Sequence, residues 1–247
     1  MTETLHLRPT ADLAERVMLP GDPGRALALA QALLDQPRMF NHHRGLWGYT
    51  GLAGDGEPLT VQSTGMGGPS AAIVLEELIM LGARRAVRIG TCGALRDTLK
   101  VGDVVVAREA LATDGASRAL GAEARIADDA VLGRTLERLA TEGDCAAERS
   151  VHAGLVVSTD LFYDPTSEGE SRWTRDALAV EMEAATLFTL GSRRGVAVGC
   201  LLAVSDRLAG PRRERISDEQ LLEAAQAMGA VALSALALPG RDPLRRP

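Results

Sequence analysis

The chain has 247 residues without a repeat or low-complexity segment, which predicts a single α/β domain with a substantial core. A formal net charge of −6 argues against a nucleic-acid partner. The longest apolar run, residues 196–204, is about half of what a bilayer requires, and the N-terminus lacks a signal-peptide core, so we expect no membrane segment. Three cysteines without paired spacing predict reduced thiols, a cytoplasmic location and no metal site.

The first predicted elements surround a glycine-rich turn. A short arm carries His6, residues 16–19 predict a strand, residues 20–25 (PGDPGR) predict a turn, and residues 26–34 predict a helix. Arg25 falls in the first turn of that helix, where the helix dipole disfavours a cation unless an anion is bound. The position therefore indicates an anion site, and the alternative is an ordinary turn with a solvated arginine.

A βαβ unit follows. Residues 59–64 predict a strand, residues 65–70 a glycine-rich turn, residues 71–81 a helix and residues 86–89 a second strand. The two strands should lie parallel, and ligands of such sheets collect at the carboxyl ends of the strands. Those ends are the glycine-rich turn and a predicted loop at residues 90–93. A dinucleotide site is excluded because the third glycine of GxGxxG is missing.

Arg88 is the most informative residue of this unit. Its apolar neighbours predict a buried strand, and an unpaired arginine there would cost several kcal/mol. Arg88 must therefore face an anion. One interpretation is a structural ion pair with an acidic side chain. The other is a bound phosphate, held together with the hydroxyl of Thr91 and nearby backbone amides.

The rest of the chain alternates strands and helices. Apolar runs predict further strands at residues 46–52, which form a hairpin with the strand at 59–64, and at residues 101–106, 151–158, 178–183 and 196–204. Helical spacing predicts helices at residues 128–142, 184–194 and 217–236, the last of them capped by Ser217 with Glu219 or Gln220. Residues 114–125 show little periodicity and predict a loop.

Several polar or aromatic residues follow predicted strand ends. Phe162 and Tyr163 are placed to stack on a ligand, or else pack in the core. Glu181 and Glu183 lie where a strand passes into a helix, so one is expected to cap the helix, and the two together favour a sugar-diol acceptor. Asp206 follows the most apolar strand and is a candidate catalytic acid, with a cap or an ion pair as the alternative.

These residues lie in motifs that resemble the nucleoside phosphorylase family of hexameric bacterial purine nucleoside phosphorylases and uridine phosphorylases. In chain order the motifs are LPGDPGR (19–25), NHHRGLWGYTG (41–51), STGMGGPS (63–70), RIGTCGA (88–94), STDLFY (158–163), VEMEA (180–184) and AVSD (203–206). The resemblance implies a three-layer α/β/α single domain over residues 1–247, with a mixed, strongly twisted central β-sheet flanked by helices. It also implies an N-terminal arm at residues 1–8 and a flexible tail at residues 238–247.

The resemblance further implies a role for individual residues. Phosphate would be bound by Gly21, Arg25, Arg44, Arg88 and Thr91. The ribose would be bound by His6, Met66, Met182 and Glu183. The base would be bound by Cys92, Gly93, Phe162, Val180 and Glu181. Asp206 would be the general acid, paired with an arginine for which Arg215 fits best and Arg212 and Arg213 remain alternatives.

The implied assembly is a homo-oligomer, expected as a hexamer built from three dimers, in which His6 and Arg44 reach the partner's site. No cofactor and no metal are implied, since inorganic phosphate is a co-substrate. The implied reaction is the reversible phosphorolysis of purine ribonucleosides or deoxyribonucleosides to the free base and the pentose 1-phosphate. Asp206 would protonate purine N7, which requires its carboxyl to carry or share a proton at working pH.

The choice between purine and pyrimidine rests on the residues that contact the base. Uridine phosphorylases of this family carry a Gln-x-Arg pair shortly after the Phe-Tyr motif, whereas residues 164–170 contain none, and those enzymes lack an acid at position 206. By contrast, STGMGGPS, Thr91 and the DGAS sequence at residues 114–117 resemble the uridine enzymes more. Uridine phosphorylase is therefore the first alternative. A nucleosidase would not need three arginines, and a binding module without catalysis is the remaining alternative.

Overall fold

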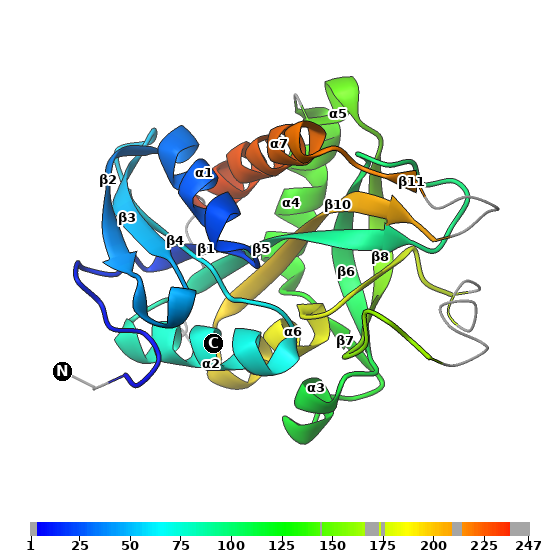
Figure 1. Cartoon of the computed structure of the whole chain (residues 1–247), viewed down its shortest axis with the longest axis horizontal. Coiled ribbons are helices and arrows are strands. Elements are labelled where there is room, and N and C mark those ends of the chain that lie inside the picture. Colours follow the sequence, from blue (N-terminus) through cyan, green and yellow to red (C-terminus); the bar gives the residue numbers. More distant parts are fainter. Residues whose placement is uncertain (1–3, 144, 166–172, 174–175, 209–213, 238–247) are drawn as a thin grey trace.

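The structure is a computed structural model that describes residues 4–143, 145–165, 173, 176–208 and 214–237. These residues form one eleven-stranded mixed sheet with helices on both faces, which confirms the expected α/β architecture (Figure 1). The expected tail at 238–247, and the alternative arginines Arg212 and Arg213, lie outside the described residues.

The N-terminal half supplies the strands β1 (Arg16–Pro20), β2 (Leu34–Asn41), β3 (Gly48–Ala53), β4 (Pro58–Gln62) and β5 (Arg85–Ala94). β1 lies between β4 and β5 and pairs parallel with both, so β4, α2 (Gly68–Leu81) and β5 are the expected parallel βαβ unit. β3 pairs antiparallel with β4, which confirms the predicted hairpin. β2, which was not predicted, adds to the edge beside β3.

The C-terminal half supplies β6 (Val104–Ala112), β7 (Arg125–Ala127), β8 (Val151–Ser158), β9 (Ala179–Glu181), β10 (Ala197–Arg207) and β11 (Glu214–Arg215). β5 pairs with β10, β10 with β6, β6 with β8, β8 with β9, and β9 again with β5. Five strands therefore close a ring. The ring brings the ends of β5, β9 and β10 together, although they are far apart in the sequence.

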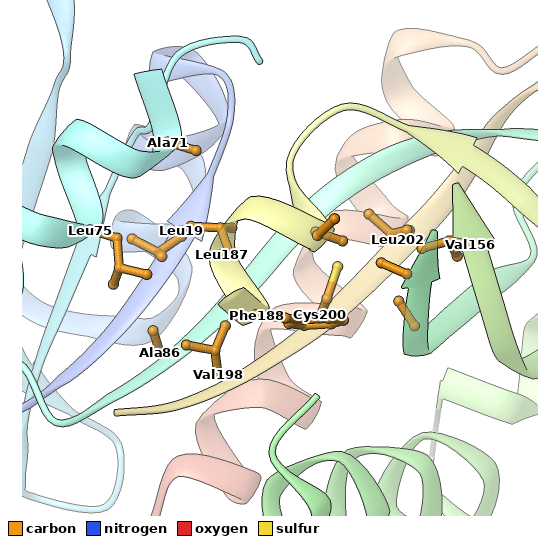
Figure 2. Packing of buried hydrophobic residues seen from close by; sticks show 14 of the residues in the cluster. Leu19, Ala71, Leu75, Ala86, Val156, Leu187, Phe188, Val198, Cys200 and Leu202 are labelled. Atoms are coloured by element: carbon orange, nitrogen blue, oxygen red, sulfur yellow. The ribbon is translucent and has the colours of Figure 1, made fainter. Parts of the chain in front are cut away.

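Helices cover the two faces in separate groups. α1 (Pro23–Leu33), α4 (Ala130–Glu142), α5 (Cys145–Glu148) and α7 (Asp218–Ala237) pack on one face, and α2, α3 (Gly115–Ala119) and α6 (Ala184–Arg194) on the other (Figure 1). Figure 2 shows the core under the second group, where Leu75 of α2 and Leu187 of α6 pack with Leu19 of β1. Burial of these apolar side chains stabilises the layers by about 25 cal/mol per Å².

Two local expectations were wrong. The segment predicted as a loop at 114–125 contains α3, because the carboxylate of Asp114 accepts a hydrogen bond from the backbone N–H of Ser117 at 2.8 Å and caps the helix. The strand predicted at 86–89 extends to Ala94, so residues 90–93 are not a loop. Their backbone groups are satisfied by pairing with β10 and β9.

α7 closes the described chain, and its first turn confirms the capping box with Gln220. Ser217 Oγ accepts a hydrogen bond from Gln220 N at 3.2 Å, while Gln220 Oε1 accepts one from Ser217 N at 3.3 Å. By length and composition alone, α7 is apolar enough to cross a bilayer. Met228, Ala232 and Leu236 are buried in the core, so packing accounts for this hydropathy.

Candidate active site

Arg88 lies on β5 with only 4 % of its surface exposed, between two buried carboxylates. Its Nε atom is 3.2 Å from Glu181 Oε2, and its Nη2 atom contacts Glu183 Oε2. Burial by itself would lower the pKa of Arg88, but the charges of Glu183 and Glu181 outweigh it and raise the pKa. The expectation that Arg88 faces an anion is confirmed, and part of that anion is supplied by the protein.

Two donor atoms of Arg88, Nε and Nη1, are buried and form no hydrogen bond with any described residue. Nε still lies beside the Glu181 carboxylate, whereas Nη1 has no ion-pair partner among the described residues, and such an orphan costs about 1–3 kcal/mol. A Cβ atom at Gly21 would lie 4.0 Å from Nη1, and one at Gly90 would approach the guanidinium to 2.7 Å. Glycine at position 90 therefore leaves room for the Arg88 side chain, and the donor lies close to the backbone of Gly21.

A second arginine approaches the same place from α1. Asp22 caps that helix by accepting a hydrogen bond from the backbone N–H of Arg25 at 2.7 Å. Burial lowers the pKa of Arg25; the charges of Asp22 and Glu183 oppose this, and that of Arg88 adds to it. Two cations thus lie close enough to repel each other, near the half-buried Thr91 of β5. This arrangement suits a multiply charged anion.

Glu183 joins two of these groups. Its Oε1 atom accepts a hydrogen bond from the backbone N–H of Gly67 at 2.5 Å, and its other oxygen contacts Arg88. The neighbouring Met182 is half-buried, and Met66, beside Gly67 in the glycine-rich loop, is 86 % exposed. Met182 and Glu183, which directly precede α6, therefore lie beside the loop that carries Met66.

Glu181 has a different environment from Glu183. Its carboxylate accepts hydrogen bonds from Ser158 Oγ at 2.5 Å and from the backbone N–H of Ala184 at 2.9 Å, in addition to facing Arg88. Burial raises the pKa of Glu181, with Arg88 opposing this and Glu183 reinforcing it. Glu181 is thus the expected cap of α6, and its carboxylate is occupied by these partners.

Asp206 lies inside β10, not after it, at a register shift that follows Val204. It is paired across the sheet with Gly93 of β5 and with Arg215 of β11, and Gly93 is also paired with Val180 of β9. Arg215 Nε is 3.9 Å from Asp206 Oδ1. Four of the predicted site residues therefore lie together where the ring of strands closes: Gly93, Val180, Asp206 and Arg215.

Cys92 and Ser205 lie beside this meeting point. The side chain of Cys92 is buried, and its Sγ atom is 3.7 Å from the carbonyl oxygen of Ala203. Ser205 Oγ lies 2.8 Å from Asp206 Oδ2 and 3.3 Å from the carbonyl oxygen of Cys92. The carboxyl of Asp206 is therefore held from both sides while 24 % of its side chain remains exposed.

Other predicted residues are not joined to this cluster. Phe162 and Tyr163 are exposed, with ring centroids 5.0 Å apart in an edge-to-face arrangement, so the core-packing alternative is wrong for both. Arg44 is exposed in η1 (His43–Gly45), and no hydrogen bond or ion pair connects it to a described residue. His6 is held on α2 by Glu77. No hydrogen bond or ion pair between described residues therefore joins Arg44 or His6 to Arg88, Glu183 or Asp206.

Comparison with known proteins identifies the family. The model of the phosphorylase superfamily matches residues 15–237. This chain belongs to the phosphorylase superfamily. Among its relatives, a purine nucleoside phosphorylase of DeoD type from Caldanaerobacter subterraneus subsp. tengcongensis is 39% identical over 201 residues, which cover 80% of this chain and 84% of the relative. A guanosine phosphorylase from Halorubrum lacusprofundi is 37% identical over 218 residues, which cover 87% of this chain and 88% of the relative.

A solved structure supports the fold of this phosphorylase-superfamily member. The uridine phosphorylase from Vibrio fischeri ES114 superimposes with a TM-score of 0.80, at 23% identity, and covers 95% of this chain and 98% of its own. Sequence reasoning missed Ser158 and Gly67 as members of the site. Both lie inside motifs that carried the resemblance, so the signal was present, but their contacts with Glu181 and Glu183 depend on the closed sheet.

Proposed function

We propose that this protein is a purine nucleoside phosphorylase, a pentosyltransferase that cleaves purine ribonucleosides and deoxyribonucleosides reversibly with inorganic phosphate. The observation that carries the choice of purine is Asp206, which lies in the sheet between Gly93 and Arg215 with part of its carboxyl exposed. The names of the relatives, purine nucleoside phosphorylase and guanosine phosphorylase, support the same substrate class.

In this proposal phosphate is the co-substrate and no cofactor takes part. The dianion lies against Gly21, Arg25, Arg88 and Thr91, and it accepts the hydrogen bond that Arg88 Nη1 lacks. Charge-assisted hydrogen bonds from a guanidinium are about twice as strong as neutral ones. Arg44 of a neighbouring subunit completes the site as a third cation, which gives the exposed side chain a role.

The reaction follows from the charges around the ribose. Breaking the bond between C1′ and the base nitrogen builds positive charge on the sugar and negative charge on the base. Phosphate, held on the opposite face, stabilises the positive charge and then forms the new bond to C1′. Glu183 accepts hydrogen bonds from the ribose 2′- and 3′-hydroxyls, and Met182 packs beneath the ring. The bound nucleoside thus displaces part of the contact between Glu183 and Arg88.

The base leaves with the electron pair of the broken bond, so it needs a proton. Asp206 donates that proton to purine N7, and Arg215 stabilises the resulting carboxylate from 3.9 Å. Gly93 and Val180 place backbone beside the base, and Phe162 covers it from an exposed position. General-acid help of this kind contributes about 10²–10⁴ in rate.

The same proposal includes assembly and location. His6 and Arg44 complete the site of a second copy, which requires at least a dimer, and we propose a hexamer of three dimers. The described cysteines Cys92, Cys145 and Cys200 are free and buried, which suits a reducing cytoplasm. Uridine phosphorylase remains the second candidate, since the solved uridine enzyme shares the fold.

The experiment that tests the substrate class compares inosine, guanosine, adenosine and uridine at saturating phosphate. We expect kcat/KM for the best purine nucleoside to exceed that for uridine by at least about a hundredfold, because only a purine has an N7 acceptor for Asp206. A preference for uridine would replace the proposal with the second candidate. Release of base from none of the four would favour a binding module.

A further inference from the structure

The carboxylate of Glu77, on α2, is the anchor of the N-terminal arm. It is buried, with 7 % of the residue exposed, and accepts hydrogen bonds from three successive backbone N–H groups. The donors are Leu5 at 3.2 Å, His6 at 3.0 Å and Leu7 at 2.6 Å. A buried charge is tolerated only when it is fully hydrogen-bonded, and here the arm supplies those bonds.

The same carboxylate also holds the His6 ring, because His6 Nδ1 is 2.7 Å from Glu77 Oε1. An ionised carboxylate only accepts hydrogen bonds, so Nδ1 carries a proton. In the neutral imidazole the other nitrogen, Nε2, is then a hydrogen-bond acceptor. The His6 side chain is 33% exposed, so the ring remains partly accessible while it is bound to Glu77.

The N-terminal arm lies far from the candidate ribose site of its own chain. Glu77 is ten residues along α2 from Gly67, the loop residue that binds Glu183, which separates them by roughly 15 Å along the helix axis. In Figure 1 the dark-blue arm lies beside α2, on the opposite side of the molecule from the tip of β10. The arm is therefore attached far from the loop residue that contacts Glu183 in its own chain.

The arm and the Arg44 turn are tied together. Asn41 Oδ1 accepts a hydrogen bond from Arg8 N at 2.9 Å, and its Nδ2 atom donates to the Leu46 carbonyl at 2.5 Å. His43 Nδ1 is 3.0 Å from the His6 carbonyl oxygen. The two elements expected to reach a partner are thus hydrogen-bonded to each other, and Glu77 attaches the arm to α2.

We propose that Glu77 is a positioning residue of the reaction, which holds His6 so that its Nε2 atom meets the 5′-hydroxyl of a nucleoside bound by a second copy of the chain. This inference rests on the proposed function and names a specificity of that site. The family resemblance implies that His6 contacts the 5′-hydroxyl, and our inference adds that Glu77 contributes to a preference for that hydroxyl only through His6.

The test measures the ratio of kcat/KM for inosine to kcat/KM for 5′-deoxyinosine in the full-length protein. We expect a ratio of about ten or more in wild type, since one hydrogen bond contributes about 1.5 kcal/mol. Glu77→Gln places an NH₂ group against a backbone N–H whichever way the amide turns, so the ratio should fall to that of His6→Ala. The double variant should show no further fall.

The matched control is Glu76→Gln, because Glu76 is the adjacent acid of α2 and hydrogen-bonds with Arg194, with Arg194 Nε donating at 3.0 Å. It should keep the wild-type ratio. If Glu77→Gln keeps the ratio while His6→Ala loses it, the positioning role is refuted. If wild type cleaves both nucleosides equally, the inference fails and the proposed function stands. If wild type cleaves neither, the proposed function itself fails.

A second measurement does not depend on how the Glu77 variant folds. Imidazole ¹⁵N NMR of the wild-type protein, with the His6 signals assigned by comparison with His6→Ala, should report a proton on Nδ1 and a bare Nε2. The opposite tautomer would overturn the proposal even if the Glu77 variant could not be purified.

Discussion

Arg88 and Glu183 form a buried ion pair that connects the residue assigned to phosphate with the residue assigned to the ribose. The pair keeps two charged side chains in place between β5 and α6 before either substrate arrives. Because Arg88 also faces Glu181, its removal would leave two buried carboxylates without their cation. Arg25, by contrast, forms no ion pair with a described residue.

This difference predicts unequal losses of stability for two similar changes. Arg88→Met should lower the free energy of unfolding by about 3–5 kcal/mol, as expected when one partner of a buried ion pair is removed. Arg25→Met should change it by less than about 1 kcal/mol. Both variants should raise the KM for phosphate at least about tenfold. Thermal unfolding and phosphate titration measure the two effects, and equal destabilisation would contradict the assignment.

Asp206→Asn should separate the chemical step from binding. The amide can hydrogen-bond but cannot deliver a proton, so kcat for inosine should fall by about 10²–10⁴. 7-Methylguanosine already carries a positive base, and its kcat should fall less than about tenfold. Asp97→Asn, at an acid whose side chain is 82% exposed, is the control and should leave both rates unchanged. An equal loss on both substrates would mean that Asp206 is structural.

A mixture of two inactive variants tests whether the site is shared. If Arg44 acts in the partner's site, Arg44→Ala and Asp206→Asn impair different chains of one site. A mixed dimer then contains one intact site, so random mixing should restore about a quarter of wild-type activity. Activity after co-expression, compared with each variant alone, is the measurement. The absence of any recovery would place Arg44 in its own chain's site or outside the reaction.

Asp128 lies away from the candidate site, and its ionisation should make the free energy of unfolding depend on pH. Burial raises its pKa to about 6, although Arg108 opposes the shift. Such a group contributes stability that is complete below its unfolded pKa of about 4 and is lost as pH rises through the folded value. Asp128→Asn stays uncharged, so its stability relative to wild type should rise by up to about 3 kcal/mol over this range.

Urea unfolding of both proteins across this pH range checks that expectation. Glu142→Gln changes an exposed acid at the C-terminal end of α4, the helix that begins just after Asp128, and should follow the wild-type curve. A difference between Asp128→Asn and wild type that does not vary with pH would show that burial of Asp128 does not control its ionisation.

The local pattern of apolar residues was sufficient to predict most of the helices and strands. The strand predicted at 151–158 has the bounds of β8, and the helix at 217–236 matches α7 to within one residue at each end. The errors occur where pairing with residues far away in the sequence determines the secondary structure. β5 extends past Ile89 because Gly93 and Ala94 find pairing partners on β9 and β10. No property of the local sequence reveals those partners.

At the candidate site, the sequence predicted the residues but not the contacts that distinguish them. The spacing of Glu181 and Glu183 indicated one cap and one ligand, yet only the closed ring of strands places Ser158 against Glu181 and Gly67 against Glu183. The pairing of β11 with β10 sets Arg215 opposite Asp206, which the sequence alone does not reveal, whereas the alternatives Arg212 and Arg213 lie outside the described residues.

The most direct test of phosphorolysis is the release of hypoxanthine from inosine with and without inorganic phosphate, measured together with ribose 1-phosphate. The unpartnered Nη1 of Arg88 and the nearby Arg25 lead us to expect negligible release without phosphate and, with phosphate, equal amounts of the two products. Release of hypoxanthine at a comparable rate without phosphate, giving free ribose, would contradict the account and indicate a nucleosidase.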